Sequence, residues 1–232
     1  MEKTTIANEK TNPFFVRLRR IPGEHWYLDE LDSNHMNIES RIKVPETILA
    51  TDFLVDQIVF FHKLVWYHFV NGELTGWLPR RNIRKNFLRI NVTAIKQETQ
   101  ADEANAYAAV QMLLDSDEVQ FNKDNLKLII SRWHGNSGNL VDLNHLVVSK
   151  TNTIKDLNGA HLRQIYKQLS RRRPIIMRVG GLNNLKSSLI VLTGYNKKLY
   201  FYNDPWTGRL ESVSRMYLKK YWQKGHLQAI SY

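Results

Sequence analysis

The sequence predicts an α+β protein in which a small all-β domain precedes a domain built of helices followed by an antiparallel sheet. Two observations support this fold class. Short apolar and aromatic runs separated by turns fill residues 14–92, as is typical of a small β-barrel. Over residues 93–232 an alanine-rich helical pattern comes first and paired strand patterns come last, which is the order of an α+β domain. Residues 1–13 are polar and predict a flexible lead-in.

A hairpin is the clearest local signal of the first domain. The aromatic strand pattern of residues 64–70 leads into an Asn-Gly dipeptide at 71–72, which favours the tight turn between two antiparallel strands. Residues 74–78 then form the return strand. Gly76 within it predicts a close approach of two backbones.

The aromatic strand, the polar-glycine turn and the Gly-Trp pair of this hairpin resemble the signature of bacterial SH3-like modules of the GW type. The resemblance implies an SH3-like barrel, and such modules often bind cell-wall polymers. Its characteristic aromatic residues would be Trp66, Tyr67 and Trp77. The alternative interpretation is that these three side chains belong to the core. Residues 80–86 follow as a basic connector without interleaved aromatic residues, which favours a solvated linker over a nucleic-acid site.

Three helices are expected early in the second domain. Residues 104–114 are alanine-rich and carry apolar side chains at helical spacing. Asp102 and Glu103 come directly before them, and acidic residues are favourable at a helix N-terminus. Residues 123–133 and 158–170 predict the other two helices.

Strand patterns lie toward the end of the chain. Residues 174–179 predict a buried strand, and residues 189–195 and 199–206 predict an apolar and an aromatic strand joined by a short turn. Residues 213–222 predict an amphipathic helix, and residues 227–231 predict a last strand.

Several short motifs of this half occur in a fixed order. They are Gln111-Met112 in the first helix, Arg173-Pro174 before a strand, Thr193-Gly194-Tyr195 and Asn203-Asp204-Pro205-Trp206. Together with the element order they resemble the papain-like fold of the bacteriocin-leader (double-glycine) peptidase-like family, over residues 95–232. That family places a glutamine before a nucleophilic cysteine at the start of an alanine-rich helix. It places a histidine at the start of the strand that ends in Thr-Gly-Tyr.

The chain departs from this family pattern at the catalytic positions. Counting back from the Gln-Met and Thr-Gly-Tyr motifs puts Asn105 at the nucleophile position and Ser188 at the general-base position. The family glutamine corresponds to Gln97 or Gln100, and Asp204 is retained. An amide is not a nucleophile of this kind, a serine hydroxyl cannot take its proton near neutral pH, and the chain contains no cysteine. The resemblance therefore implies a pseudoenzyme, a papain-like domain without catalytic activity.

Other residues of this half give little support to catalysis. The remaining histidines lie on predicted helix ends or loops, at His134, His145, His161 and His226. A hydrolase that uses Ser187 or Ser188 stays as the alternative enzyme, although the surrounding sequence lacks the glycines of a nucleophile elbow. No metal-ligand spacing and no phosphate-binding loop occur, so neither a metal nor a cofactor is expected.

A groove that has lost its nucleophile can still hold an extended peptide through backbone hydrogen bonds and apolar pockets. The predicted groove residues are Asn105, Tyr107, Ser188, Asp204 and Trp206. Degenerate peptidase-like domains in bacteriocin and toxin exporters bind substrates without cutting them. The resemblance thus implies a peptide- or polymer-binding module in a bacterial setting, linked to bacteriocin export or to the cell wall.

The charge of the chain is strongly positive. The formal net charge is +11, and residues 96–232 carry 20 basic against 11 acidic residues. The predicted basic patch comprises Arg171, Arg172, Arg173, Lys219 and Lys220. It favours an acidic peptide or another anionic polymer as the partner. Nucleic acid is an alternative that no motif supports, and a merely solvated surface is the alternative without a partner.

Sequence signals for targeting are absent. No apolar run approaches the ~20 residues that span a bilayer, and the first ten residues lack the apolar core of a signal peptide. The chain is therefore expected in the cytoplasm, or outside the cell at the cell wall if a leader had been removed. The absence of cysteine excludes disulfides and thiolate metal sites, and nothing in the sequence indicates the oligomeric state.

Overall fold

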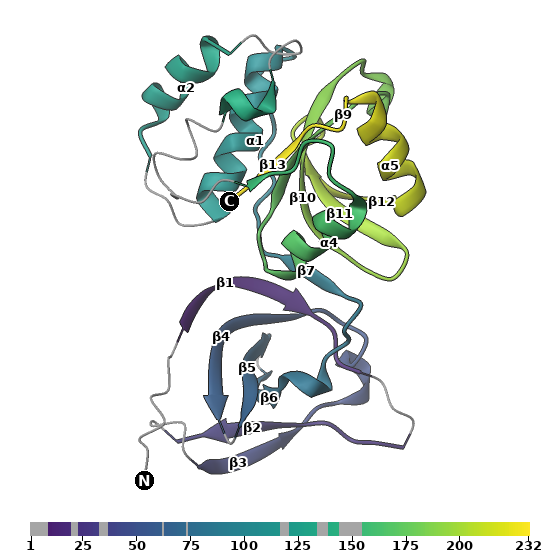
Figure 1. Ribbon diagram of the computed structural model, residues 1–232. Helices are drawn as coiled ribbons and strands as arrows, with labels where there is room; N and C mark the ends of the chain where they lie inside the picture. Colours follow the sequence, from purple (N-terminus) through teal and green to yellow (C-terminus); the bar gives the residue numbers. More distant parts are fainter. Residues whose placement is uncertain are drawn as a thin grey trace. The chain divides into compact units, whose positions relative to one another are not determined.

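The computed structural model describes residues 9–19, 23–32, 37–61, 63–72, 74–116, 121–133, 139–143 and 155–232. The chain divides into two compact units, Met1–Leu88 and Arg89–Tyr232, and each is described by itself (Figure 1). Strand β7 (Leu88–Ile90) lies at the division. The predicted domain boundary near residue 92 falls in the extended segment that follows it. The pairings described below are all antiparallel, and with the helices of unit 2 they make the chain an α+β protein.

The described part of unit 1 is built from β-strands and short 3-10 turns. Its strands are β1 (Glu9–Val16), β2 (Tyr27–Leu31), β3 (Ile38–Lys43), β4 (Phe53–Phe61), β5 (Leu64–Asn71) and β6 (Leu74–Pro79), with short 3-10 turns η1 (Glu46–Ile48) and η2 (Arg80–Asn82). They pair in the order β3-β2-β6-β5-β4-β1. The core of this unit is formed by alternate side chains of the strands, among them Phe14, Val16, Phe53, Val55 and Phe69.

The predicted lead-in over residues 1–13 is wrong for its last residues. Strand β1 already begins at Glu9 and pairs with β4, whereas residues 1–8 lie outside the described part. Pro13 does not prevent this strand, because the register shifts between Lys10 and Phe14 and so leaves a gap in the ladder where a missing N–H is tolerated. Polarity alone suggested a tail, but strand pairing uses backbone groups and does not require apolar side chains.

The predicted hairpin is present as β5 and β6, with Asn71 opposite Leu74. Gly76 has a φ of +150°, and a Cβ on it would lie 2.8 Å from the Cβ of Leu28. The glycine therefore allows β6 to run close against β2. The three aromatic residues Trp66, Tyr67 and Trp77 are 7%, 7% and 6% exposed. They are core side chains, so the interpretation as ligand contacts is not supported by their burial.

Unit 2 contains the helices of the described chain. They are α1 (Asp102–Ser116), α2 (Lys123–Ser131), α4 (Leu162–Ser170) and α5 (Arg215–Lys224), with 3-10 turns η4 (Leu140–Leu143) and η5 (Leu182–Asn184). The strands are β8 (Lys155–Asp156), β9 (Ile175–Val179), β10 (Ser188–Tyr195), β11 (Leu199–Asp204), β12 (Arg209–Ser214) and β13 (Ala229–Ser231). Their order is β8-β13-β9-β10-β11-β12. Figure 1 shows α1 on one side of β9 and β10 and α5 on the other.

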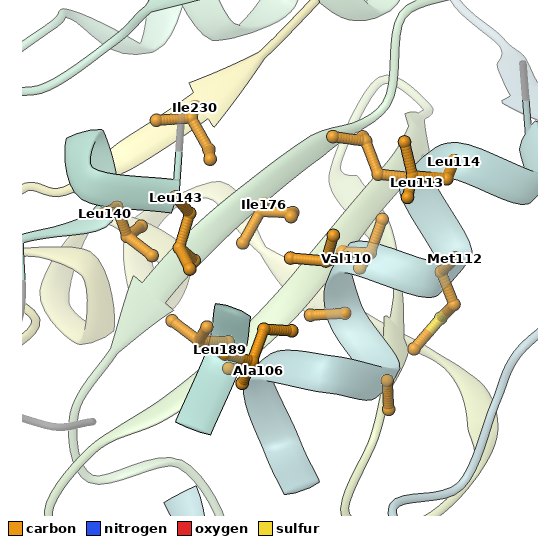
Figure 2. Packing of buried hydrophobic residues seen from close by; sticks show 14 of the residues in the cluster. Ala106, Val110, Met112, Leu113, Leu114, Leu140, Leu143, Ile176, Leu189 and Ile230 are labelled. Carbon is orange, nitrogen blue, oxygen red and sulfur yellow. The ribbon is translucent and has the colours of Figure 1, made fainter. Parts of the chain in front are cut away.

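The main core of unit 2 lies between α1 and the sheet. Figure 2 shows Ala106 and Val110 of α1 facing Ile176 of β9, Leu189 of β10 and Ile230 of β13. All five side chains are at most 2% exposed. The alanines of α1 let the helix approach the strands closely, which is the reason for the alanine-rich sequence. Burying an aliphatic side chain of this size stabilises the fold by about 1.5–3 kcal/mol.

Among the differences from the prediction are two helix starts and one strand. Helix α4 begins at Leu162 rather than at residue 158, because the side chain of Asn158 accepts a hydrogen bond from Ala229 N and holds the preceding turn against β13. Helix α5 begins at Arg215 rather than at residue 213, because the Ser214 hydroxyl caps its first turn. Strand β12 was not predicted, since its exposed or half-buried, mostly polar residues carry no alternating apolar pattern.

The helices in the described part of the chain lack the length and apolar character that crossing a membrane requires.

Candidate functional site

Asn105 joins the first helix of unit 2 to the central strand of the sheet. It lies in the first turns of α1 and is 7% exposed. Its Oδ1 accepts a hydrogen bond of 2.7 Å from Leu189 N of β10. Its Nδ2 lies 3.0 Å from Gln97 Oε1, 3.3 Å from Ser188 Oγ and 3.4 Å from Leu189 O, so two amide hydrogens serve three acceptors. The side chain is fully engaged with neighbours from both sides.

Gln97 is the glutamine that contacts Asn105. Its Nε2 donates a hydrogen bond of 2.7 Å to Thr99 O, which turns the Oε1 toward the helix. Its backbone N donates to Pro205 O over 2.8 Å. Gln100, the other candidate for the family glutamine, is exposed in the bend just before α1. The geometry thus brings Gln97, and not Gln100, next to Asn105.

The Asn-Asp-Pro-Trp corner holds the segment that carries Gln97. Asn203 Nδ2 donates a hydrogen bond of 2.8 Å to Val92 O, at the start of that segment. Gly208 closes the corner with a φ of +68°, and a Cβ on it would lie 2.6 Å from Lys96 Cβ. The extended residues 91–97 therefore run directly along the corner, which positions Gln97 against α1.

Asp204 is a buried carboxylate with both oxygens engaged. It is 1% exposed. Its Oδ1 accepts a hydrogen bond of 2.9 Å from Trp206 N, and its Oδ2 accepts one of 2.7 Å from Asn183 Nδ2. Burial raises the pKa of the Asp204 carboxyl above its usual range, and the two hydrogen bonds oppose that rise. The indole of Trp206 is half-buried.

Ser188 and Asp204 lie on neighbouring strands of the sheet. The pairing of Val191 with Asn203 is antiparallel, and one further step places Ile190 opposite Asp204. Ser188 lies two residues from Ile190 and so projects from the same face of β10. Diagonal neighbours of this kind are about 7–8 Å apart at the backbone. Asn105, Ser188 and Asp204 thus occupy one region, although Asp204 bonds to Asn183 and Trp206 instead of to the other two.

Asn183 is a site residue that sequence reasoning did not find. It lies in η5 with a φ of 51°, and its neighbour Asn184 has a φ of 61°. Asparagine adopts this left-handed conformation more readily than other residues with a Cβ. The Asn-Asn pair after two glycines was the available signal, but it indicates a loop conformation and does not reveal the contact with Asp204.

Arg178 is a second residue that the sequence did not single out. It lies on β9 opposite Leu189 and is only 2% exposed. Its Nε donates to Gln228 Oε1 over 3.1 Å and its Nη1 to Ser187 Oγ over 3.3 Å, while the guanidinium lies 5.3 Å from the ring centre of Trp133. Burial lowers the pKa of this guanidinium. The Ser187 hydroxyl therefore accepts a hydrogen bond from a cation instead of facing a base.

A pocket of about 310 Å³ adjoins Gln97. It lies between the segment before α1, the outer face of α1 and helix α2. The apolar part of its wall comprises Ile95, Ala101, Ala104, Ala108 and Ile130. Tyr107 and Lys127 lie on the wall as well, with the ammonium 5.6 Å from the ring centre, and Glu98 and Glu103 add negative charge. Tyr107 therefore lines the same pocket as Gln97.

The residues of the predicted basic patch lie directly after α4 and within α5. Arg171 is exposed at the end of α4, whereas Arg172 and Arg173 are half-buried. Lys219 and Lys220 are exposed on α5.

The arrangement around Asn105 offers hydrogen bonding but no proton-transfer pair. Its contacts within the described residues are amides, a hydroxyl and backbone groups. His161 lies at the N-cap of α4 and His226 follows α5, while His134 and His145 lie outside the described residues. Without a base, neither Asn105 nor Ser188 can be activated as a nucleophile by its described partners.

Two comparisons with known proteins found matches for unit 2. A family model described as the Peptidase_C39 like family matches residues 89–230, which is more than half of the chain. A solved chain described as a C39-like peptidase from Bacillus anthracis aligns with a TM-score of 0.52 at 18% sequence identity. The alignment covers 61% of this chain and 94% of that one, and at this identity it shows a shared fold. The comparison with curated proteins found no significant match.

Proposed function

Because the chain belongs to the Peptidase_C39 like family, whose papain-like fold unit 2 shares, we propose that it is a catalytically inactive member that binds a peptide without cutting it. The peptide lies along α1 and Gln97, where its side chains reach the pocket. Cleavage of an amide bond needs a nucleophile paired with a base. In this proposal the chain has neither at the family positions.

The observation that carries the proposal is the bonding of Asn105. This side chain stands at the nucleophile position, and all its hydrogen-bonding capacity is directed at Gln97, Ser188 and the backbone of Leu189. A nucleophile must instead be free to approach the substrate carbonyl. Asn105 is therefore a structural link between α1 and β10.

The environment of Asp204 supports the same proposal. In a catalytic triad the carboxylate orients an imidazole. Here Asn183 and the backbone of Trp206 already take both carboxylate oxygens. Asp204 therefore stabilises the corner that holds Gln97, and its role in this protein is structural.

The pocket next to Gln97 supports binding as the retained activity. Its wall combines small apolar residues of α1 with charged groups of both signs, Lys127 and Glu103 among them. Such a mixture suits an extended peptide with an apolar side chain in the pocket and polar groups at its mouth. The positive net charge favours an acidic peptide.

Unit 1 enters the proposal as a separate binding or anchoring module. Its all-β architecture, with the hairpin of β5 and β6 and the glycine of β6 close to β2, is compatible with the SH3-like barrel that the sequence suggests. We assign residues 14–92 to this module and residues 93–232 to the papain-like domain.

A hydrolysis assay tests the loss of activity. Purified full chain is incubated with a library of fluorogenic peptides, and no turnover above buffer is expected. The Ser188→Ala variant is measured in parallel, because a hydrolase that used this hydroxyl would lose its activity in the variant. Turnover by the unmodified chain that Ser188→Ala abolishes would overturn the proposal.

A double variant tests whether positions 105 and 188 have the geometry of a catalytic pair. Asn105→Cys combined with Ser188→His supplies a thiol and an imidazole at the two family positions. Its thiol should react with iodoacetamide at pH 6 about tenfold faster than the thiol of Asn105→Cys alone, because a neighbouring imidazole lowers the pKa of a thiol. An equal rate in both variants would show that positions 105 and 188 do not form a catalytic geometry.

A further inference from the structure

Helix α5 has two sides of opposite character. Leu218 and Trp222 are 0% and 1% exposed and hold the helix against unit 2. On the solvent side, Met216 is 70% exposed and Tyr217 is 48% exposed. An exposed methionine and an exposed tyrosine side by side place a strongly apolar spot on the surface. Neither residue takes part in the site around Asn105.

Lysines surround this apolar spot. Lys219 and Lys220 are both exposed. Lys220 lies four residues after Met216 and three after Tyr217, so Met216, Tyr217 and Lys220 share one face of the helix. The sequence of α5 contains no acidic residue, and the strand before it contains only Glu211. We call Met216, Tyr217, Lys219 and Lys220 the outer face of α5.

We propose that the outer face of α5 docks on the surface of an anionic lipid bilayer. Met216 and Tyr217 enter the boundary between headgroups and acyl chains, where an apolar body with a polar tip is favourable. Lys219 and Lys220 lie beside them at the level of the lipid phosphates, and each lysine near an anionic membrane strengthens binding about fivefold. Apolar insertion and charge attraction thus act from the same face.

The combination favours lipid over nucleic acid as the partner. Phosphate contacts explain lysines on either surface, but they leave the 70% exposed side chain of Met216 without a role. Single-stranded nucleic acids also bind in charged grooves whose aromatic residues stack on the bases. The Tyr217 ring is instead stacked on Tyr221 of the same helix, with ring centres 6.3 Å apart, and it projects from a convex helix.

This docking goes beyond peptide binding and leaves the pocket accessible. The pocket lies against α1 and α2, and within unit 2 α1 and α5 lie on opposite sides of β9 and β10 (Figure 1). A bilayer that contacts the outer face of α5 therefore does not cover Gln97. The lipid surface and the peptide can be bound together.

Vesicle co-sedimentation of the full chain tests the proposal. Vesicles of phosphatidylcholine alone are compared with vesicles of equal parts phosphatidylcholine and phosphatidylglycerol, and binding to the anionic vesicles alone is expected. Removing both lysines in Lys219→Ala/Lys220→Ala should weaken binding about 25-fold. Met216→Gln should weaken it about tenfold at unchanged net charge. Lys123→Ala/Arg132→Ala, which removes the same charge from α2, is the matched control and should bind like the unmodified chain.

Each outcome decides the proposal. Equal binding to neutral and anionic vesicles, or equal losses in the α5 and α2 double variants, would overturn it, since the outer face would then have no special part. Unchanged vesicle binding by Met216→Gln would exclude apolar insertion and also overturn the proposal. A polyuridine oligonucleotide that binds the chain through Lys219 and Lys220 while anionic vesicles do not would assign the surface to nucleic acid. Thermal unfolding of every variant confirms that these exposed substitutions leave the fold intact.

Discussion

The side-chain Nδ2 of Asn183 donates a hydrogen bond of 2.7 Å to the Oδ2 of Asp204. In a papain-like triad an imidazole would make this bond to the carboxylate. The asparagine reaches the carboxylate only because its own backbone adopts a φ of 51° in the loop before β10. Asp204 thus has a neutral partner from this loop, and Asn105 with Gln97, Ser188 and Leu189 forms a second set of hydrogen bonds nearby.

Asn105→Ala should lower the free energy of unfolding by about 1–3 kcal/mol. The substitution leaves Leu189 N buried without its acceptor and removes the link between α1 and β10. Urea denaturation with circular dichroism measures the loss. Gln111→Ala, a half-buried change on the same helix, is the control and should cost less. A loss below that of the control would mean that the Asn105 bonds add nothing to stability.

Double-mutant cycles with Asn105→Ala should show energetic coupling for Gln97 but not for Gln100. Gln97→Ala removes the acceptor for Asn105 Nδ2, so its cost should shrink when Asn105 is already alanine, with a coupling of about 0.5–1.5 kcal/mol. Gln100→Ala changes an exposed side chain and should cost the same in both backgrounds. Denaturation of the four proteins in each cycle supplies the values. Coupling to Gln100 rather than to Gln97 would contradict the contact.

Asp204 should make the protein less stable as the pH rises. Its folded pKa is raised by burial, so its contribution is fully present below the ordinary carboxyl pKa of 3.8 and is lost as the pH rises through the higher folded pKa. The unfolding free energy of the unmodified chain minus that of Asp204→Asn should therefore fall across this window. Denaturation at a series of pH values measures the difference, and a rise across the window would show that the hydrogen bonds outweigh burial.

Asn183→Ala extends this test. It removes one of the two hydrogen bonds that oppose the rise of the Asp204 pKa. The fall in stability should then continue to higher pH than in the unmodified chain. An unchanged endpoint would indicate that Asn183 does not stabilise the charged carboxylate.

Ala104→Trp should weaken peptide binding about tenfold, because the indole would occupy the pocket beside Gln97. The measurement is fluorescence polarisation with a labelled acidic peptide that contains leucine. Leu128→Trp places the same indole on α2, at an exposed position that does not line the pocket, and should not change the affinity. If the unmodified chain binds the peptide and both variants bind it with equal affinity, the peptide binds outside this pocket.

The sequence was informative wherever a local pattern determines structure. The Asn-Gly hairpin follows from turn geometry, and the alanine-rich helix α1 from its apolar spacing. Strand β12 escaped prediction because its mostly polar side chains are exposed or half-buried, and the strand is defined by its backbone pairing with β11. The start of β1 at Glu9 escaped because residues 9–12 are polar in sequence. A strand that is held by backbone pairing alone shows no apolar pattern in the amino-acid sequence.

Motif spacing alone brought out Asn105 and Ser188, and the two side chains lie 3.3 Å apart. It could not choose between Gln97 and Gln100, because that choice depends on how the segment before α1 is fixed by the backbone of Pro205. Asn183 and Arg178 depend on a left-handed loop and on a buried cation whose partners come from distant segments. Contacts of this kind arise from tertiary structure and carry no local signal.

The hydrogen bond from Leu189 to Asn105 spans 84 residues of chain. During synthesis, α1 emerges from the ribosome long before β10. The Asn105 side chain therefore lacks its partner Leu189 until β10 has been made. A non-local contact of this length is typical of domains that fold slowly, so a nascent chain that ends before Leu189 exposes the apolar side of α1. Arrested chains of increasing length should therefore stay sensitive to protease across this helix until β10 has been made.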